Sequence, residues 1–319
     1  MIHLHSLDEV NPEKPTLITI GSFDGVHIGH QAIIRELIAE AHERGMRTAV
    51  LTFYPHPSVV LRGRQPAFYI IHPEEKAELL SSLGVDITIT HPFSRVVSRI
   101  TASEFINKLR TRLDIREIWA GADFALGHNR KGTIDWLKEN SSDFNLRIRV
   151  LPPVKLDNDI VSSSFVRTTL RSGDVELVAR CLGRPLRIPG RVIEGIERGS
   201  RQLYPTANLK IWSERAFPAI GIYACQAAVH GESYAAVASI NHLPSIDNEI
   251  GAQTIRTHLL DFEDDIYGAR LTLDFITRIR PKQTSDDNTV TLGIQQSDIE
   301  ATRRVAKQKI RQRCNETIS

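Results

Sequence analysis

The first half of the chain alternates short apolar runs with helical patterns, and this alternation restricts the possible folds more than any other feature. Five runs have the length and composition of strands, at residues 16–23, 47–53, 85–90, 115–121 and 146–154. Apolar residues at helical spacing lie between them, and residues 164–182 predict a closing helical segment. Such strands alternating with helices predict an α/β fold in which helices cover both faces of a parallel sheet.

The second half has a different pattern, which begins at L-G-R-P-L-R-I-P-G-R-V, residues 182–192. Short strands separated by turn residues follow at 190–195, 221–229, 233–240, 254–262 and 269–279, and they predict a small antiparallel barrel. The tail returns to a helical pattern from Ser297. A chain of 319 residues can form two domains of ordinary size, and we place their boundary near residue 184, giving domains 1–183 and 184–319.

Bulk composition narrows the classes of function. Hydrophobic residues make up 41% of the chain and charged residues 24%, which is typical of a soluble globular protein. The net charge of +2 does not suggest a broad nucleic-acid surface, and the basic stretch at residues 303–314 has no interleaved aromatic residue for base stacking. No apolar stretch is long enough to span a bilayer, and residues 1–15 do not have the pattern of a secretory signal.

The three cysteines, Cys181, Cys225 and Cys314, are scattered and lack metal-ligand spacing. Free thiols of this kind are typical of a reducing compartment, so we expect a cytoplasmic protein. From the net charge and the lack of a spanning stretch we expect neither nucleic-acid nor membrane partners.

The stretch G-S-F-D-G-V-H-I-G-H, residues 21–30, lies between the first predicted strand and its helix. Gly21 and Gly25 allow the backbone to turn tightly and to approach a ligand. His27 and His30 flank the start of the helix on one face, where unpaired N–H groups and the helix dipole favour an anion, and Gly29 keeps side-chain bulk away. We expect a phosphate site here; the alternative is a turn with two surface histidines.

The letters H-I-G-H also occur in class I aminoacyl-tRNA synthetases, whose second signature is Lys-Met-Ser-Lys-Ser. This chain has two methionines, Met1 and Met46, and neither lies in such a motif. In its place stands V-S-S-S-F-V-R, residues 161–167, whose serines suit a helix cap. We expect Arg167 in the first turn, where a cation opposes the dipole unless an anion binds between it and the serines. The alternative is an ordinary capped helix with a surface arginine.

Together these motifs resemble the bifunctional prokaryotic riboflavin kinase/FMN adenylyltransferases, also called FAD synthetases, over nearly the whole chain. Four further matches carry the resemblance: T-F-Y-P-H-P at 52–57, G-A-D-F-A-L-G-H-N-R-K-G at 121–132, L-G-R-P at 182–185 and P-T-A-N at 205–208. The resemblance implies a Rossmann-like nucleotidyltransferase domain with a parallel sheet, then a six-stranded antiparallel barrel like that of riboflavin kinases, and a C-terminal helix.

The resemblance also implies the chemistry. The first domain is expected to transfer AMP from ATP to FMN, giving FAD and pyrophosphate, and the barrel to phosphorylate riboflavin with ATP, giving FMN and ADP. Small-molecule substrates are the expected partners, and Mg²⁺ is expected to bridge the phosphates through few protein ligands. In-line transfer of this kind depends on positioning and charge stabilisation rather than on a covalent nucleophile.

The resemblance assigns residues to each role as follows. The catalytic residues are His27, His30 and Arg167; the ATP-binding residues are Gly21, Phe23, Asp24, Gly25, Gly29, Ser162, Ser163 and Ser164; the flavin-binding residues are Pro55, His56, Pro57, Asp123, Phe124, Asn129 and Arg130; and the residues for the ATP and metal of the kinase are Thr206 and Asn208. Phe124 could instead be a core residue.

The chain departs from the family pattern in both halves. In the first, Tyr54 replaces an aspartate, and Leu126 replaces an aromatic residue but could still cover a flavin ring. In the second, Leu203 replaces a glycine, the pattern Arg-x-Glu-x-Lys-Phe is lost near residues 278–287, and Arg256 replaces a glutamate that the family is expected to use as base. An arginine cannot accept a proton at neutral pH, so we expect slow or absent kinase activity.

Other readings stay open at this point. His258 or Asp261 could substitute for the missing base, although strand alternation places His258 on the same face as Arg256. The first domain could be a nucleotidyltransferase for another phosphorylated acceptor. The chain could also be a flavin- or nucleotide-binding regulator whose barrel is vestigial.

Overall fold

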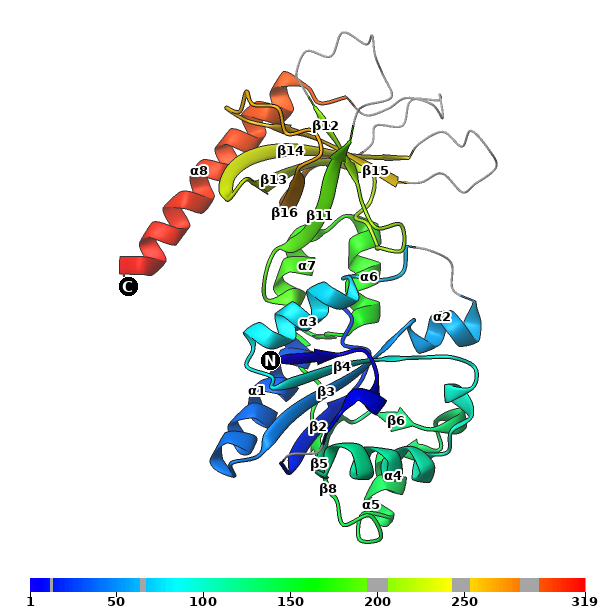
Figure 1. Cartoon of the computed structure of the whole chain (residues 1–319). Helices are drawn as coiled ribbons and strands as arrows, with labels where there is room; N and C mark the ends of the chain where they lie inside the picture. The colour runs from blue at the N-terminus through cyan, green and yellow to red at the C-terminus, as the bar shows by residue number, and fades with distance from the viewer. Residues whose placement is uncertain (12–13, 64–66, 194–205, 243–252, 282–292, 319) are drawn as a thin grey trace. The chain divides into compact units, whose positions relative to one another are not determined.

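The computed structural model describes residues 1–11, 14–63, 67–193, 206–242, 253–281 and 293–318 (Figure 1). The chain divides into two compact units, Met1–Phe165 and Val166–Ser319. The division falls inside helix α6 (Ser163–Ser172), which begins in the first unit and ends in the second.

A six-stranded parallel sheet forms the centre of the first unit, as the sequence predicted. Its strands are β1 (Ile2–Leu4), β2 (Thr16–Ile20), β3 (Arg47–Tyr54), β4 (Ile87–Pro92), β5 (Ile115–Gly121) and β8 (Arg147–Leu151), in the order β1-β4-β3-β2-β5-β8. The prediction missed β1, which has only three residues. Because the chain winds in opposite directions from β2 and from β5, the switch point at which ligands bind lies between these two strands.

Helices cover both faces of this sheet (Figure 1). The covering helices are α1 (Ile28–Glu43), α3 (Pro73–Ser82), α4 (Ala102–Leu113) and α5 (Ile134–Glu139). The unit also contains the short helix α2 (Pro57–Arg62), which has no buried residue, and the 3-10 turns η1 (Leu7–Glu9), η2 (Val97–Arg99) and η3 (His128–Arg130). The side chains of β2 alternate between the two faces. Leu17 packs with Leu37 of α1, and Ile18 packs in a second cluster with Phe105 of α4.

Two short hairpins complete the unit. Strands β6 (Ala125–Leu126) and β7 (Gly132–Thr133) pair with each other, as do β9 (Lys155–Leu156) and β10 (Asp159–Ile160).

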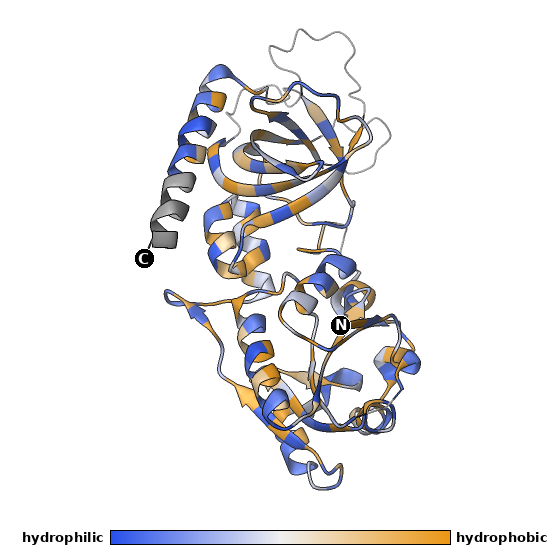
Figure 2. Cartoon of the chain, turned by 60° about the vertical axis from the view of Figure 1, so that its left-hand side comes forward, coloured by the Kyte–Doolittle hydropathy of each residue, from blue (hydrophilic) through white to orange (hydrophobic). Residues whose placement is uncertain are grey.

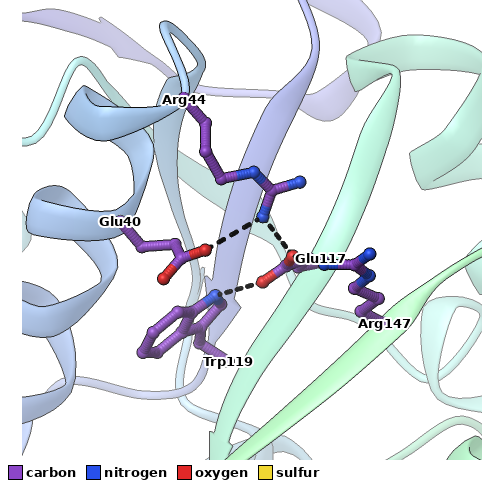
Figure 3. A network of polar contacts seen from close by, with 5 residues as sticks. All are labelled: Glu40, Arg44, Glu117, Trp119 and Arg147. Carbon is purple, nitrogen blue, oxygen red and sulfur yellow. Dashed lines mark hydrogen bonds and ion pairs between the residues drawn. The ribbon is translucent and has the colours of Figure 1, made fainter.

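A polar network ties the last turn of α1 to the sheet (Figure 3). The carboxylate of Glu117 on β5 is fully buried and accepts hydrogen bonds from Arg44 and, at 3.2 Å, from Nε1 of Trp119. Arg44 also pairs with Glu40 at 3.3 Å, and Arg147 approaches Glu117 at 3.8 Å. Helix α1, which begins directly after His27, is therefore anchored at its opposite end.

The second unit contains two short helices and a closed six-stranded barrel. Helices α6 and α7 (Val175–Leu182) replace the single helical segment predicted over 164–182, because Gly173 adopts a left-handed φ of 83° and Asp174 caps α7. The barrel strands are β11 (Leu186–Ile193), β12 (Ala207–Lys210), β13 (Gly221–Val229), β14 (Glu232–His242), β15 (Gln253–Leu259) and β16 (Arg270–Pro281), in the order β11-β12-β15-β14-β13-β16.

Antiparallel pairing closes this barrel, which confirms the predicted fold; the short strand β12 was not among the strands expected from the sequence. Hydrophobic and hydrophilic residues alternate along the strands (Figure 2), as expected where one face of a strand fills a barrel. Helix α8 (Gln296–Ile318) packs Ile299 against Ile222 and Val237 outside the barrel. Among the described residues, none of the helices combines the length and apolar character needed to span a membrane.

Candidate active site

The loop between β2 and α1 has an unusual backbone at the carboxyl end of β2. Three residues have positive φ: Phe23 (46°), Gly25 (84°) and Val26 (42°). Glycine adopts this conformation freely, whereas each of the other two costs on the order of 1 kcal/mol and needs surrounding contacts to hold it. The loop lies next to the switch point, where a strained and well-held backbone is typical of a functional site.

His27 and His30 form a stacked pair at the start of α1. His27 caps the helix, because its Nδ1 accepts a hydrogen bond from the backbone N–H of His30 at 3.4 Å. The ring centroids are 3.6 Å apart and the ring planes differ by 21°. Since Nδ1 of His27 is the acceptor, neutral His27 carries its proton on Nε2, which makes this nitrogen a donor suited to a phosphate oxygen.

His30 is the more unusual member of the pair. Its pKa lies well below the ordinary value, first because the imidazole is buried and then because His27 and Lys76 are nearby. Among the described residues, Nδ1 of His30 has no hydrogen-bond partner although it is buried. A buried polar atom without a partner is costly and calls for an explanation, which ligand binding can supply.

Gly21 and Gly29 leave space for the aromatic rings of Phe23 and His27, in addition to any space they leave for a phosphate. A Cβ at Gly29 would lie 3.2 Å from two ring atoms of His27, and a Cβ at Gly21 would lie 3.2 Å from the ring of Phe23. Phe23 is buried, and its ring contacts that of His30 with centroids 4.8 Å apart. The two glycines thus set the positions of the aromatic residues that surround the histidine pair.

Asp24 holds the loop from another side. Its buried carboxylate accepts hydrogen bonds from the backbone N–H of Ile70 at 2.9 Å and of Ile71 at 3.3 Å. Its carbonyl oxygen accepts a hydrogen bond from Oγ of Ser163 at 2.8 Å. The structure therefore gives Asp24 a bracing role, and contact with ATP stays a prediction.

The predicted serine cap is present at α6. Oγ of Ser162 accepts a hydrogen bond from the backbone N–H of Phe165 at 3.1 Å, and Ser164 is exposed. Arg167 is the fifth residue of α6, so the expectation that it lies in the first turn is wrong. It is 5% exposed, which also excludes the alternative of a surface arginine.

The P-H-P segment forms the start of α2. The Tyr54–Pro55 peptide bond is cis, and Pro57 is the first residue of the helix. His56 caps the helix: its Nδ1 accepts from Ser58 N–H at 3.0 Å, and its own N–H donates to the Tyr69 hydroxyl at 2.7 Å. The segment thus has a local structural role, and its contact with a flavin stays a prediction.

The predicted flavin loop, residues 121–132, presents polar side chains and buries Leu126. Asp123, Asn129 and Arg130 are exposed, and Nη2 of Arg130 donates to the Asp123 carbonyl at 2.9 Å. Phe124 is half-buried and packs against the core cluster, while Leu126 belongs to that cluster and is 8% exposed. Leu126 therefore lies in the core rather than on a surface where it could cover a flavin ring.

In the barrel, the strand register brings Asn208, Arg256 and Ser239 into one row. Asn208 on β12 pairs with Arg256 on β15, which pairs with Ser239 on β14. Thr206 lies two residues before Asn208, and both are half-buried. Residues directly opposite in a sheet project from the same face, so Asn208 and Arg256 are neighbours. Leu203 and residues 282–287 lie outside the described part of the chain.

Arg256 and His258 are both half-buried, whereas Ile255 and Thr257, the two neighbours of Arg256 in the strand, are fully buried, which confirms that the two basic residues share a face. Within the described ranges there is no cluster of three or more His, Cys, Asp or Glu side chains that could hold a metal ion. The oxygen atoms of Thr206 and Asn208 are nevertheless of the type that Mg²⁺ uses together with phosphates and water.

The sequence motifs did not point to Lys76. Its Nζ donates to the carbonyl of Ser22, in the loop, and to the hydroxyl of Thr52, on β3. The sequence held one signal for Lys76, which is its spacing along the helix. It falls on the same helical face as three other residues, and all four are buried: Pro73, Lys76, Ala77 and Leu80.

Comparisons with known proteins agree with this geometry. The family model described as FAD synthetase matches residues 10–165, and the one described as riboflavin kinase matches residues 182–306. A bifunctional riboflavin kinase/FMN adenylyltransferase from Bacillus subtilis is 34% identical over 283 residues, which are 88% of this chain and 89% of the relative. A protein of the same name from Escherichia coli is 30% identical over 282 residues, again 88% and 89% of the two chains.

A solved structure, described as a macrolide-efflux protein from Streptococcus pneumoniae, is similar in fold over most of its length. Its TM-score is 0.81 at 28% identity, and the match covers 90% of this chain and 93% of that one. The resemblance found in the sequence is thus confirmed over both units. The chain belongs to the bifunctional riboflavin kinase/FMN adenylyltransferase family.

Proposed function

We propose that this protein acts in FAD biosynthesis, with its first unit as an FMN adenylyltransferase. The observation that carries the proposal is the stacked pair His27 and His30 at the start of α1, in which a buried nitrogen of His30 has no hydrogen-bond partner in the part of the chain that the structure describes. The pair lies at the carboxyl edge of a parallel sheet, where the N-terminus of a helix favours phosphate. Family membership supplies the substrates, ATP and FMN.

The proposed reaction is an in-line displacement. An oxygen of the FMN phosphate forms a bond to the α-phosphorus of ATP, while the bond from that phosphorus to the bridging oxygen breaks and pyrophosphate leaves. The Nε2–H of His27 and backbone N–H groups at the start of α1 would stabilise charge on the α-phosphate. The hydroxyl groups of Ser162 and Ser163 and the guanidinium of Arg167 would bind the departing phosphates.

The remaining assignments stay proposals that rest on the family resemblance. Exposed Asp123, Asn129 and Arg130 are suited to polar contacts with the flavin. Phe124 keeps part of its ring exposed, so an edge remains available for the isoalloxazine. We also retain residues 1–183 and 184–319 as the two functional halves.

For the barrel we propose a riboflavin kinase that turns over slowly. Thr206 and Asn208 would hold Mg²⁺ with the phosphates of ATP, and the ion would neutralise charge on the transferred phosphoryl group. Arg256 stands opposite Asn208, brings positive charge next to this site and cannot act as a general base. The same observation favours a second candidate function for the barrel alone, in which it binds flavin without phosphorylating it.

Two separate reactions test the proposal: FMN with MgATP, and riboflavin with MgATP, with products identified by chromatography. We expect FAD and pyrophosphate from the first and little FMN from the second. His27→Ala should lower FAD formation by about 100-fold or more, as removal of a key charge-stabilising donor does. His42→Ala is the matched control, because His42 is an exposed histidine in the last turn of the same helix.

Absence of FAD from the wild-type chain would exclude the proposed adenylyltransferase. A parallel reaction with pantetheine phosphate as the acceptor tests the alternative of a nucleotidyltransferase with another substrate. A dinucleotide product from that acceptor, without FAD from FMN, would establish the alternative.

A further inference from the structure

Lys76 of α3 places a buried cation beneath the loop that carries the histidine pair. Its side chain is only 6% exposed. Nζ donates hydrogen bonds to the Ser22 carbonyl at 3.0 Å and to Oγ1 of Thr52 at 2.7 Å. The Thr52 hydroxyl in turn donates to the Ser22 carbonyl at 2.9 Å. These three groups form a closed triangle that joins α3, the carboxyl end of β3 and the loop after β2.

A lysine is a costly choice for this position. Both hydrogen-bond acceptors of its ammonium group are neutral oxygens. Burial lowers the pKa of Lys76 to about 8, although Asp24 and Glu74 attract the charge. An apolar side chain of similar length would fill the same space without the desolvation penalty of an ammonium. A charge kept in the interior at such a cost, beside a candidate active site, points to a role in function.

The position of Lys76 explains what that role is. The loop contains the non-glycine residues Phe23 and Val26 at positive φ, and such a backbone persists only where several contacts determine it. Asp24 supplies contacts on one side through Ile70 and Ile71. Lys76 supplies the contact at Ser22, directly before the strained residues.

Lys76 also acts on the histidine pair through its charge. The groups that lower the pKa of His30, besides burial, are His27 from the start of α1 and Lys76 from α3. The lysine therefore favours the neutral form of His30 and places positive charge near the proposed triphosphate site. Both effects require an ammonium group, and a neutral side chain could not reproduce them.

We propose that Lys76 is a positioning residue for adenylyl transfer, which fixes loop 21–26 through Ser22 and Thr52 and thereby sets the geometry of His27 and His30. This inference rests on the proposed function of the first unit. Lys76 does not take part in bond making; it acts through the loop and the imidazoles.

The test compares Lys76→Met, Thr52→Val and the double variant in the FAD-forming reaction of the full chain. Lys76→Met should lower kcat by about tenfold or more, because a small displacement of positioning groups has effects of this size. Thr52→Val should lower kcat less, and the double variant should be no slower than Lys76→Met, since both changes break one triangle. The acidic limb of the kcat profile should move to higher pH in Lys76→Met, because His30 loses a neighbouring cation.

Lys108→Met is the matched control, because Lys108 is a lysine of the same unit that pairs with Asp8 at 3.1 Å in a partly exposed ion pair. It should keep the wild-type kcat and pH profile. A folded Lys76→Met variant with wild-type kcat and an unchanged pH profile overturns the inference. If that variant does not fold, Thr52→Val decides, and a wild-type kcat there has the same consequence. Absence of FAD from the wild-type chain overturns the proposed function as well, whereas equal FAD formation by wild type and Lys76→Met overturns the inference alone.

Discussion

Asn208 and Arg256 lie directly opposite each other on β12 and β15. Their side chains share one face of the barrel, and Ser239 on β14 completes the row. A guanidinium in this row would repel a metal ion at the proposed site of Asn208, and it cannot remove a proton from a substrate hydroxyl. Because the strand register places Arg256 opposite Asn208, we expect the replacement of the family's glutamate by Arg256 to slow the phosphorylation of riboflavin.

The variant Arg256→Glu should gain riboflavin kinase activity. A carboxylate next to Asn208 would attract Mg²⁺ and could act as a general base, a role that contributes about 100-fold or more to a rate. The measurement is FMN formation from riboflavin and MgATP. Arg270→Glu makes the same charge change at an exposed position of β16 and should leave the rate unchanged. An unchanged or lower rate for Arg256→Glu would show that the arginine does not limit the kinase.

The variant Gly29→Ala should separate activity from stability. Alanine is favoured over glycine inside a helix by about 0.5–1 kcal/mol, so the free energy of unfolding should fall little or even rise. The new Cβ, however, would lie 3.2 Å from the ring of His27 and displace it. We therefore expect kcat for FAD formation to fall by about tenfold.

Unfolding curves and FAD assays of the same preparation check this prediction. Gly293→Ala is the control, because a Cβ there meets no atom within 4 Å. Wild-type kcat in Gly29→Ala would show that the ring position of His27 does not matter to the reaction.

Much of the fold could be predicted from the sequence because the periodic spacing of apolar residues identifies the buried strands. The alternation of Leu17 and Ile18 between two helical layers is the pattern of a strand covered on both faces, and such runs also define β3, β4 and β5. The edge strand β1 and the barrel strand β12 were missed because three or four residues are too few to show a period. The break between α6 and α7 depends on the left-handed conformation of Gly173, which a helical pattern does not reveal.

The sequence predicted those parts of the candidate site whose residues are close to one another along the chain. His27 and His30 are close in sequence, so a helix start is enough to bring them together. Lys76 was missed because its partners Ser22 and Thr52 are 54 and 24 residues away, and only the folded sheet brings them into contact. Leu126 was misplaced for a similar reason, since its burial depends on the packing of a core assembled from many segments.

Glu117→Gln should weaken the fold without changing the reaction. The glutamine keeps a hydrogen bond to Trp119 but loses the charge that pairs with Arg44, so we expect a loss of about 1–2 kcal/mol in unfolding free energy. Urea unfolding measures this loss, and Asp114→Asn, which breaks the exposed pair with Arg116, should cost less than about 0.5 kcal/mol. A large fall in kcat for FAD formation in a stable Glu117→Gln variant would contradict a purely structural role of the network.

The pKa of Lys76 leads to a pH dependence of stability with a definite sign. The folded chain lowers this pKa from 10.5 to about 8, so between these values the unfolded chain binds a proton that the native chain has released. Stability therefore rises with pH across this window, by on the order of 3 kcal/mol when complete, and below about pH 8 the native state bears the full cost of a buried charge.

Lys76→Met removes this dependence. At pH 7 the variant should be at least as stable as the wild type, and its advantage should shrink as the pH rises from 8 to 10, because the wild-type lysine becomes neutral. Urea unfolding of both proteins at several pH values measures the difference, and Lys108→Met is the control, because Lys108 lies in a partly exposed ion pair rather than in the interior. If the wild type were instead the more stable protein at pH 7, and equally so at pH 10, the charge of Lys76 would not be a cost, and its presence would need no explanation from catalysis.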